Sequence, residues 1–466
     1  MALAVLSDED IRGLLESLSL EEAEGFSFSL KSALHEYSTG TQSIESGLIH
    51  QPDRTTIHSN ASNSTTLFVP SCSVAGHGVK VMTVPSPEAD PSHTVKPTGS
   101  LTLFSPLGAP IGFLHAQTLT AFRTALASTC LLQKRQRVQT ITVFGSGLQA
   151  YWHIRLALMF RGPTIRHVYV INRRFSENAK NILNKFYAVH ADTKTREGWE
   201  HTKFSMLTPG YGEFHRLLKD HVRESDVIYC TTPSRDPLFE GSILTSHEGR
   251  RKGRLIIAVG SYTPDMRELP TELLQQAVKS HKGTHFHKHA IEGGVIIVDT
   301  LDGALKEAGE VIEAQLEPKQ LVELGELAMI QKARMAEEEE SMASGSTRGS
   351  TDISSDMDSL SLGTTGSSAI STVFGSSASK DTADSSLPSS PARSHHGGFF
   401  HKRRSSSRGS VDRGKQNRDD HLARWLTSGN VIYKSVGLGL MDLVVGMEII
   451  KLARDRGVGT QVESFS

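Results

Sequence analysis

The chain of 466 residues is long enough for two or three domains with a sizeable core, and its formal net charge of −1 creates no global field that would attract nucleic acid or a membrane surface. No apolar run approaches the roughly 20 residues that span a bilayer, and the first residues lack the pattern of a secretory signal. The three cysteines, Cys72, Cys130 and Cys230, match no metal spacing, so we expect a cytoplasmic protein without a metal site.

The first part of the chain predicts two helices and then an antiparallel sheet. Ser7 and Asp10 have the spacing of a capping box, and a second helical stretch runs from about Leu20 to Tyr37. Short runs rich in β-branched residues follow, separated by turn residues, at 54–58, 66–69, 78–84, 101–104 and 111–115. Residues 118–132 predict a further helix, with Thr118 as its N-cap.

A nucleotide-binding motif follows the next predicted strand, at 140–144. The stretch Gly145-Ser146-Gly147-Leu148-Gln149-Ala150 matches the pattern G-x-G-x-x-A. The first glycine allows a sharp turn out of the strand, the second lets the backbone approach a pyrophosphate, and the alanine lets the new helix pack on its strand. The anion would bind the free N–H groups at the start of that helix. A strand at 167–171 completes a βαβ unit.

Further apolar runs have the composition of buried parallel strands, at 227–230, 255–259 and 295–298. Together with the motif they predict a doubly wound sheet between about residues 139 and 300. The loops that follow parallel strands approach a bound dinucleotide. We therefore expect further cofactor-binding residues at these positions, namely Thr231, Thr232, Val259, Gly260 and, after a later strand, Ser435.

The segment Asn172-Arg173-Arg174 bears on which cofactor is bound. NAD sites usually place Asp or Glu at this point to accept a hydrogen bond from the ribose 2′-hydroxyl, whereas the 2′-phosphate of NADP needs cations. The segment has no carboxylate and two positive charges. It therefore predicts NADPH, with NAD as the alternative.

The composition changes after residue 336. Residues 305–336 predict helix, whereas 337–420 are dominated by Ser, Gly, Thr and charged residues and cannot bury enough apolar surface to form a core. We expect a disordered insertion there. A basic stretch at 402–408 is compatible with a phosphorylation or localisation signal, or with a solvated loop. A strand at 430–435 and a long helix at 437–456 then follow.

Four separated stretches, at 120–125, 144–150, 259–269 and 435–443, resemble one family. Together they are similar to the ornithine cyclodeaminase/mu-crystallin family over nearly the whole chain except the Ser-rich segment. The resemblance implies an α/β homodimer with a Rossmann-type dinucleotide-binding domain inserted in a split α+β substrate and dimerisation domain. The nucleotide domain would cover 137–304. Residues 1–136, and the helices of 305–336 and 421–466, would form the substrate domain, and 337–420 the disordered insertion.

The resemblance also assigns three cations to the site of a small imino-acid or amino-acid substrate. Arg54 and Arg123 match the family's carboxylate-binding arginines, whose planar guanidinium can pair with a carboxylate through two hydrogen bonds. Lys80 matches the active-site lysine, which binds the carboxylate or donates a proton; its apolar neighbours favour a buried position with a lowered pKa. From spacing alone, a surface cation is the simpler interpretation of each.

The acidic residue departs from the cyclodeaminase pattern. In cyclodeaminases of the family an aspartate follows the Val-Gly-x of the third motif, but here that position is Tyr262. Asp265, three residues later, is the candidate catalytic acid, as in the reductase-like members. The alternative is that Asp265 belongs to a structural cluster at the start of a helix.

These residues favour one function over two alternatives. The first is NADPH-dependent reduction of a cyclic or linear imino acid, of the ketimine or Δ1-pyrroline-2-carboxylate type. The second is an ornithine cyclodeaminase-like lyase that converts ornithine to proline and ammonia with bound NAD. The third is a non-catalytic, crystallin-like protein that binds a small ligand, and the presence of Arg54, Lys80 and Arg123 argues against it.

Overall fold

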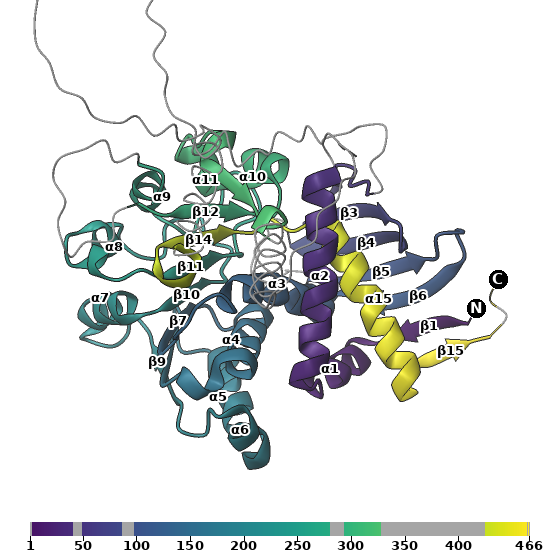
Figure 1. Cartoon of the computed structure of the whole chain (residues 1–466), viewed down its shortest axis with the longest axis horizontal. Coiled ribbons are helices and arrows are strands. Elements are labelled where there is room, and N and C mark those ends of the chain that lie inside the picture. The colour runs from purple at the N-terminus through teal and green to yellow at the C-terminus, as the bar shows by residue number, and fades with distance from the viewer. Residues whose placement is uncertain are drawn as a thin grey trace, which may run out of the picture.

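The computed structural model describes residues 2–40, 49–85, 97–279, 293–327, 425–463 and 465. The insertion predicted at 337–420 lies outside these residues. Figure 1 shows two units side by side, one built on an eight-stranded sheet and the other on a seven-stranded sheet, with helix α3 (Ala116–Leu132) between them. The protein therefore has the predicted α/β fold, with its two sheets in separate units.

The seven-stranded sheet contains the predicted antiparallel meander and one strand from each end of the chain. In spatial order its strands are β15 (Thr460–Val462), β1 (Leu3–Leu6), β6 (Pro110–His115), β5 (Thr98–Phe104), β4 (Gly76–Pro85), β3 (Ser64–Ser73) and β2 (Thr55–Ser59). All neighbours are antiparallel except β1 and β6. The two ends of the chain thus meet at one edge of this sheet (Figure 1).

Four helices pack with this sheet: α1 (Asp8–Glu16), α2 (Leu20–Gly40), α3 and α15 (Gly439–Arg456). The capping box of α1 is confirmed, because Ser7 Oγ accepts from Asp10 N–H and Asp10 reaches back to Ser7 N–H. The predicted cap of α3 is wrong. The helix begins at Ala116 after His115, and Thr118 instead donates through its N–H and its hydroxyl to Asp8 of α1.

The other sheet is parallel throughout. Its strands in spatial order are β13 (Leu321–Glu323), β12 (Val295–Val298), β14 (Val431–Lys434), β11 (Leu255–Ala258), β10 (Val227–Cys230), β7 (Thr140–Phe144), β8 (His167–Ile171) and β9 (Lys203–Leu207). Residues 305–336 and 421–466 were expected to complete the substrate domain, as helices apart from the strand predicted at 430–435. That strand is present as β14, but it lies in this parallel sheet between β11 and β12. Residues 321–323, predicted as helix, form the edge strand β13. The other proposed domain limits stay a prediction.

The parallel sheet is buried on both faces, so its strands read as continuous apolar runs. Successive residues enter different cores: Val143 and Ile257 join the core that contains α3, α4 (Leu148–Arg161) and α5 (Glu177–Ala188). Phe144 and Ile256 join the opposite core. The helices of that second face are α7 (Phe214–Glu224), α8 (Ser242–Thr245), α9 (Thr271–Ala277), α10 (Leu301–Glu307) and α11 (Gly309–Glu313). A short helix, α6 (Ala191–Glu197), precedes β9.

The helix α15 connects the two units. It follows β14 of the parallel sheet, crosses over to the seven-stranded sheet, and lies along β3, β4 and β5 with α2 beside it (Figure 1). None of the helices in the described ranges is long and apolar enough to cross a membrane.

Candidate functional site

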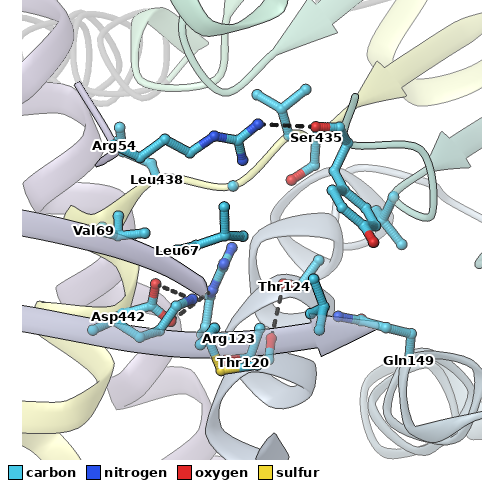
Figure 2. Close-up of a pocket in the computed structure, with 18 residues that line it drawn as sticks. Arg54, Leu67, Val69, Thr120, Arg123, Thr124, Gln149, Ser435, Leu438 and Asp442 are labelled. Carbon is cyan, nitrogen blue, oxygen red and sulfur yellow. Dashed lines mark hydrogen bonds and ion pairs between the residues drawn. The ribbon is translucent and has the colours of Figure 1, made fainter. Parts of the chain in front are cut away.

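An open cavity lies where the two units meet (Figure 2). One wall is the face of the seven-stranded sheet that points toward α15. Strand register puts Lys80 opposite Val69, and Met82 opposite Leu67, on this one face. The opposite wall comes from loops at the carboxyl edge of the parallel sheet. The full lining comprises Arg54, Leu67, Val69, Lys80, Met82, Val84, Thr120, Arg123, Thr124, Gln149, Val259, Tyr262, Ser435, Val436, Gly437, Leu438, Gly439 and Asp442.

Two of the predicted cations share one buried carboxylate. Lys80 Nζ lies 2.7 Å from Asp442 Oδ2, and Arg123 Nε lies 3.0 Å from Asp442 Oδ1. All three side chains are buried. Burial lowers the pKa of Lys80 to about 8, and the attraction of Asp442 opposes that shift. Asp442 thus holds both cations, with its one negative charge between them.

The third cation, Arg54, enters the cavity from another side (Figure 2). Its Nε pairs with Glu307 Oε1 of α10 at 2.8 Å, and its Nη2 donates to the carbonyl of Tyr262 at 3.0 Å. Burial raises the pKa of Glu307, and Arg54 counteracts that rise. The structure therefore brings Arg54, Lys80 and Arg123 to one cavity, as the resemblance implied.

Asp265 does not join them. It is absent from the cavity lining, and its half-exposed carboxylate lies 3.3 Å from Arg235 and accepts from Thr263 Oγ1. In the loop after β11, Tyr262 lines the cavity, whereas Asp265 is exposed. The catalytic role predicted for Asp265 has no support in this arrangement. The alternative of a helix-start cluster has none either, because the next helix, α9, begins only at Thr271.

The glycine-rich loop has the geometry of an anion site. Gly145 has φ +108°, and a Cβ on it would lie 2.8 Å from Thr231 Oγ1, so a larger residue would strain the turn. Gly147 is the N-cap of α4 and offers no side-chain acceptor, while a Cβ there would meet no atom within 4 Å. Open space therefore faces the free N–H groups of a 14-residue helix, which suits a pyrophosphate. Ser146, Leu148 and Gln149 continue this loop and first turn, and Ala150 is buried against the core.

The other predicted cofactor residues follow the ends of parallel strands. Asn172 follows β8, and its side chain donates to the carbonyl of Arg174. Arg173 and Arg174 are exposed, and neither guanidinium has an ion-pair partner within the part of the chain that the structure describes. Thr231 Oγ1 donates to the carbonyl of Phe144, which ties the loop after β10 to the glycine-rich turn.

Sequence reasoning missed two aspartates that organise this site. Asp442 is a charged residue among apolar ones, in Leu440-Met441-Asp442-Leu443. A charge on a helix face that is otherwise apolar could have identified it as a site residue. Asp299 directly follows β12 and is buried. Its Oδ2 accepts from Ser435 Oγ at 2.7 Å and from the N–H of Gly437 at 2.9 Å. Asp299 thereby shapes the crossover into α15.

The Gly437 position shows why that crossover needs a glycine. Its φ is +92°, and a Cβ there would lie 3.0 Å from Arg123 Nη2.

Among the described residues, no group of three or more His, Cys, Asp or Glu side chains is arranged to hold a metal ion.

Comparisons with known proteins identify relatives in sequence and in fold. No protein-family model matches the chain. The chain is 28% identical over 314 residues to the ketimine reductase mu-crystallin of Mus musculus, covering 66% of this chain and 82% of that protein. It is 32% identical over 162 residues to an uncharacterized cyclodeaminase of Dictyostelium discoideum, covering 34% and 42%.

Among solved structures, the Δ1-pyrroline-2-carboxylate reductase of Thermococcus litoralis, in complex with NADH and L-proline, matches with a TM-score of 0.58 at 18% identity. That match covers 99% of this chain and all of the other, and it shows the shared fold. The chain is thus similar in sequence to members of the ornithine cyclodeaminase/mu-crystallin family, and it shares the fold of the solved reductase.

Proposed function

We propose that this protein is an NADPH-dependent reductase of small imino acids, acting on the C=N bond of a cyclic or linear ketimine carboxylate. One observation carries the proposal. Arg54, Lys80 and Arg123 line a cavity that also receives Val259 and Ser435 from the carboxyl edge of the parallel sheet, beside the dinucleotide motif. A carboxylate-binding cluster thus adjoins the edge at which parallel sheets bind dinucleotides.

The charges of the cavity suit a substrate with one carboxylate. Arg54, Lys80 and Arg123 supply three positive charges, and Asp442 and Glu307 supply two negative ones, which leaves one positive charge. Arginine offers two parallel N–H donors to a carboxylate. The other sheet residues of the lining are apolar, namely Leu67, Val69, Met82 and Val84, and they fit an uncharged substrate body.

Each residue then has a defined role. A bound NADPH supplies the hydride for the C=N carbon. The imine nitrogen gains a proton, and Lys80 Nζ is the ammonium in the cavity that can donate it or can hold the carboxylate. Asp442 orients Lys80 and Arg123. Gly145 to Ala150, with Arg173 and Arg174, would hold the phosphates, and Thr231, Thr232, Val259, Gly260 and Ser435 would enclose the nicotinamide end.

A cyclodeaminase is the second candidate, and the relative that bears that name supports it. That reaction needs an acidic group for the departing amine. Tyr262 stands in the cavity where the cyclodeaminases of the family have an aspartate, and the nearest aspartate of that loop faces solvent. This arrangement favours the reductase.

We also propose a homodimer and a cytoplasmic location. The face of the seven-stranded sheet that points away from α15 carries partly exposed apolar residues, among them Phe68, Val79, Val81 and Phe113. A second copy of the chain would cover this face. The three cysteines are free thiols, in keeping with a reducing compartment.

The test is a steady-state screen of purified protein with NADPH against cyclic and linear imino acids, and with NAD⁺ against ornithine. A reductase oxidises NADPH only when an imino acid is present. Release of ammonia and proline from ornithine without net use of the cofactor would instead identify the lyase. Tight binding of an imino acid without turnover would favour the crystallin-like binding protein.

Variants then test the site on the best substrate. Removing one hydrogen bond to a charged group costs about 1.5–3 kcal/mol, or roughly tenfold to more than a hundredfold in affinity. Arg54→Ala and Arg123→Ala should therefore raise KM by that factor and leave the affinity for NADPH unchanged. Lys80→Ala should lower kcat as well. Lys319→Ala, which removes an exposed lysine paired with Glu317, is the control. Wild-type kinetics in all three cavity variants would refute this assignment.

A further inference from the structure

A buried group of charged side chains lies beneath the loops that follow β10, β11 and β14. Glu268, Glu310 and Lys434 are at most 1% exposed. Burying an ionised group is unfavourable unless it is paired and hydrogen-bonded. Burial accordingly raises the pKa of Glu268 to about 7, although the charge of Lys434 opposes that rise. Because burial of this carboxylate costs free energy, we expect Glu268 to have a role other than packing.

The contacts of Glu268 show what it does. Its Oε1 accepts from the backbone N–H of Thr232 at 2.7 Å, in the loop after β10. Its Oε2 accepts from the N–H groups of Gly260 at 2.7 Å and Ser261 at 3.2 Å, in the loop after β11. The two loops also touch directly, because a Cβ on Gly260 would lie 2.3 Å from Thr232 N. One carboxylate therefore holds two loops together.

The rest of the cluster fixes Glu268 in turn. Its backbone N–H donates to Glu310 Oε1 at 2.9 Å, and the same oxygen accepts from Ser261 Oγ at 2.5 Å. Lys434 Nζ donates to Ser261 Oγ at 2.6 Å and lies 3.6 Å from Glu310 Oε2. Lys434 and Ser261 directly precede the cavity-lining residues Ser435 and Tyr262 in the sequence. The cluster thus joins the carboxyl ends of three strands directly beneath the cavity wall.

We propose that Glu268 is a positioning residue that holds the loops at Thr232 and Gly260 in the shape that receives the nicotinamide end of the dinucleotide. This role rests on the proposed function, since it presupposes that a nicotinamide cofactor binds at this edge. The glycine-rich loop and Arg173 belong to the phosphate and adenine end. None of the hydrogen bonds of Glu268 in the described ranges reaches them, although Thr231 ties the loop after β10 to the glycine-rich turn. Removal of Glu268 should therefore affect the nicotinamide end more than the phosphate end.

The first measurement is amide hydrogen exchange without any ligand. Glu268→Gln keeps the shape of the side chain but removes its charge and one acceptor oxygen. The amides of Thr231, Thr232 and Ser234 and those at 259–262 should then exchange about tenfold faster or more. Asp226→Asn is the matched control, because Asp226 also accepts from two backbone N–H groups, those of Gln139 and Thr140, at the opposite edge of the sheet. Unchanged exchange at 231–234 and 259–262 in E268Q, or the same acceleration there in D226N, would overturn the proposal.

The second measurement is binding of NADPH and of adenosine 2′,5′-bisphosphate, which lacks the nicotinamide. E268Q should bind NADPH about tenfold more weakly and the bisphosphate as tightly as the wild type. Equal losses for both ligands would contradict the positioning role. If E268Q does not fold, Glu268→Asp replaces it, because the shorter carboxylate keeps the charge but cannot span both loops. Failure of the wild-type protein to bind NADPH would instead overturn the proposed function, while the exchange result still decides whether Glu268 holds the loops.

Discussion

Lys80 Nζ lies 2.7 Å from Asp442 Oδ2, although the two residues are 362 positions apart in the chain. The other oxygen of Asp442 accepts from Arg123 Nε. Strand β4, helix α3 between the two units and the last helix, α15, must therefore all be in place before the cation cluster exists. The carboxylate of Asp442 sets the distance between the two cations, and with it the space left for a substrate.

Replacing Asp442 with asparagine should impair the site. Asn has one acceptor oxygen and no charge, so it cannot hold both cations, and we expect kcat/KM to fall about tenfold or more. Asp455→Asn is the control, because Asp455 is exposed on the same helix. Steady-state kinetics on the best imino acid decide the matter: equal kinetics in both variants would exclude an organising role for Asp442.

The reaction should depend on pH through Lys80. Burial holds the pKa of this lysine at about 8, below its ordinary value of 10.5, so the free enzyme carries the ammonium below that pH and loses it above. The pH dependence of kcat/KM reports the pKa values of the free enzyme. This ratio should therefore be constant below pH 8 and fall about tenfold for each pH unit above it. In Lys80→Arg the cation persists, and the alkaline fall should disappear. If it remained, the titrating group would be the substrate or another residue.

The choice of cofactor should depend on Arg173. Its exposed guanidinium follows β8, where a 2′-phosphate would lie. Arg173→Ala should weaken NADPH binding about tenfold or more and change NADH binding by less than about twofold. Arg166→Ala is the control, since Arg166 is exposed next to the other end of β8. Isothermal titration calorimetry measures the affinity for each cofactor. An equal loss of affinity for NADPH and NADH would contradict a contact between Arg173 and the 2′-phosphate.

The oligomeric state should depend on the sheet face that points away from α15. A charge placed on this face would be buried without a partner in a dimer, so Phe113→Asp should shift the protein toward the monomer. Phe28→Asp is the control: Phe28 is 69% exposed on α2, away from that face. Sedimentation velocity distinguishes the species. A dimer that survives Phe113→Asp at micromolar concentration, or a wild-type monomer, would contradict this interface.

Local sequence patterns were sufficient to predict most of the helices and strands. The capping box at Ser7 and Asp10, the β-branched runs of the antiparallel meander and the glycine pattern at 145–150 are each read within a few residues, and the structure has them where they were predicted. The apolar strands of the parallel sheet were found for the same reason, because burial on both faces leaves no polar alternation. The resemblance to the family identified Arg54, Lys80 and Arg123 as site residues, whereas spacing alone would have suggested surface cations.

Only the tertiary structure decided what those residues contact. Strand β14 entered the parallel sheet between β11 and β12, which no local pattern specifies, because strand order depends on how the whole chain packs. The same packing brought Asp442 to Lys80 and Arg123, and Glu268 to the loops at Thr232 and Gly260. It also turned Asp265 to solvent. The sequence determines which side chains carry charge, but whether a charge meets a partner, a cavity or water depends on distances between segments that are far apart in the chain.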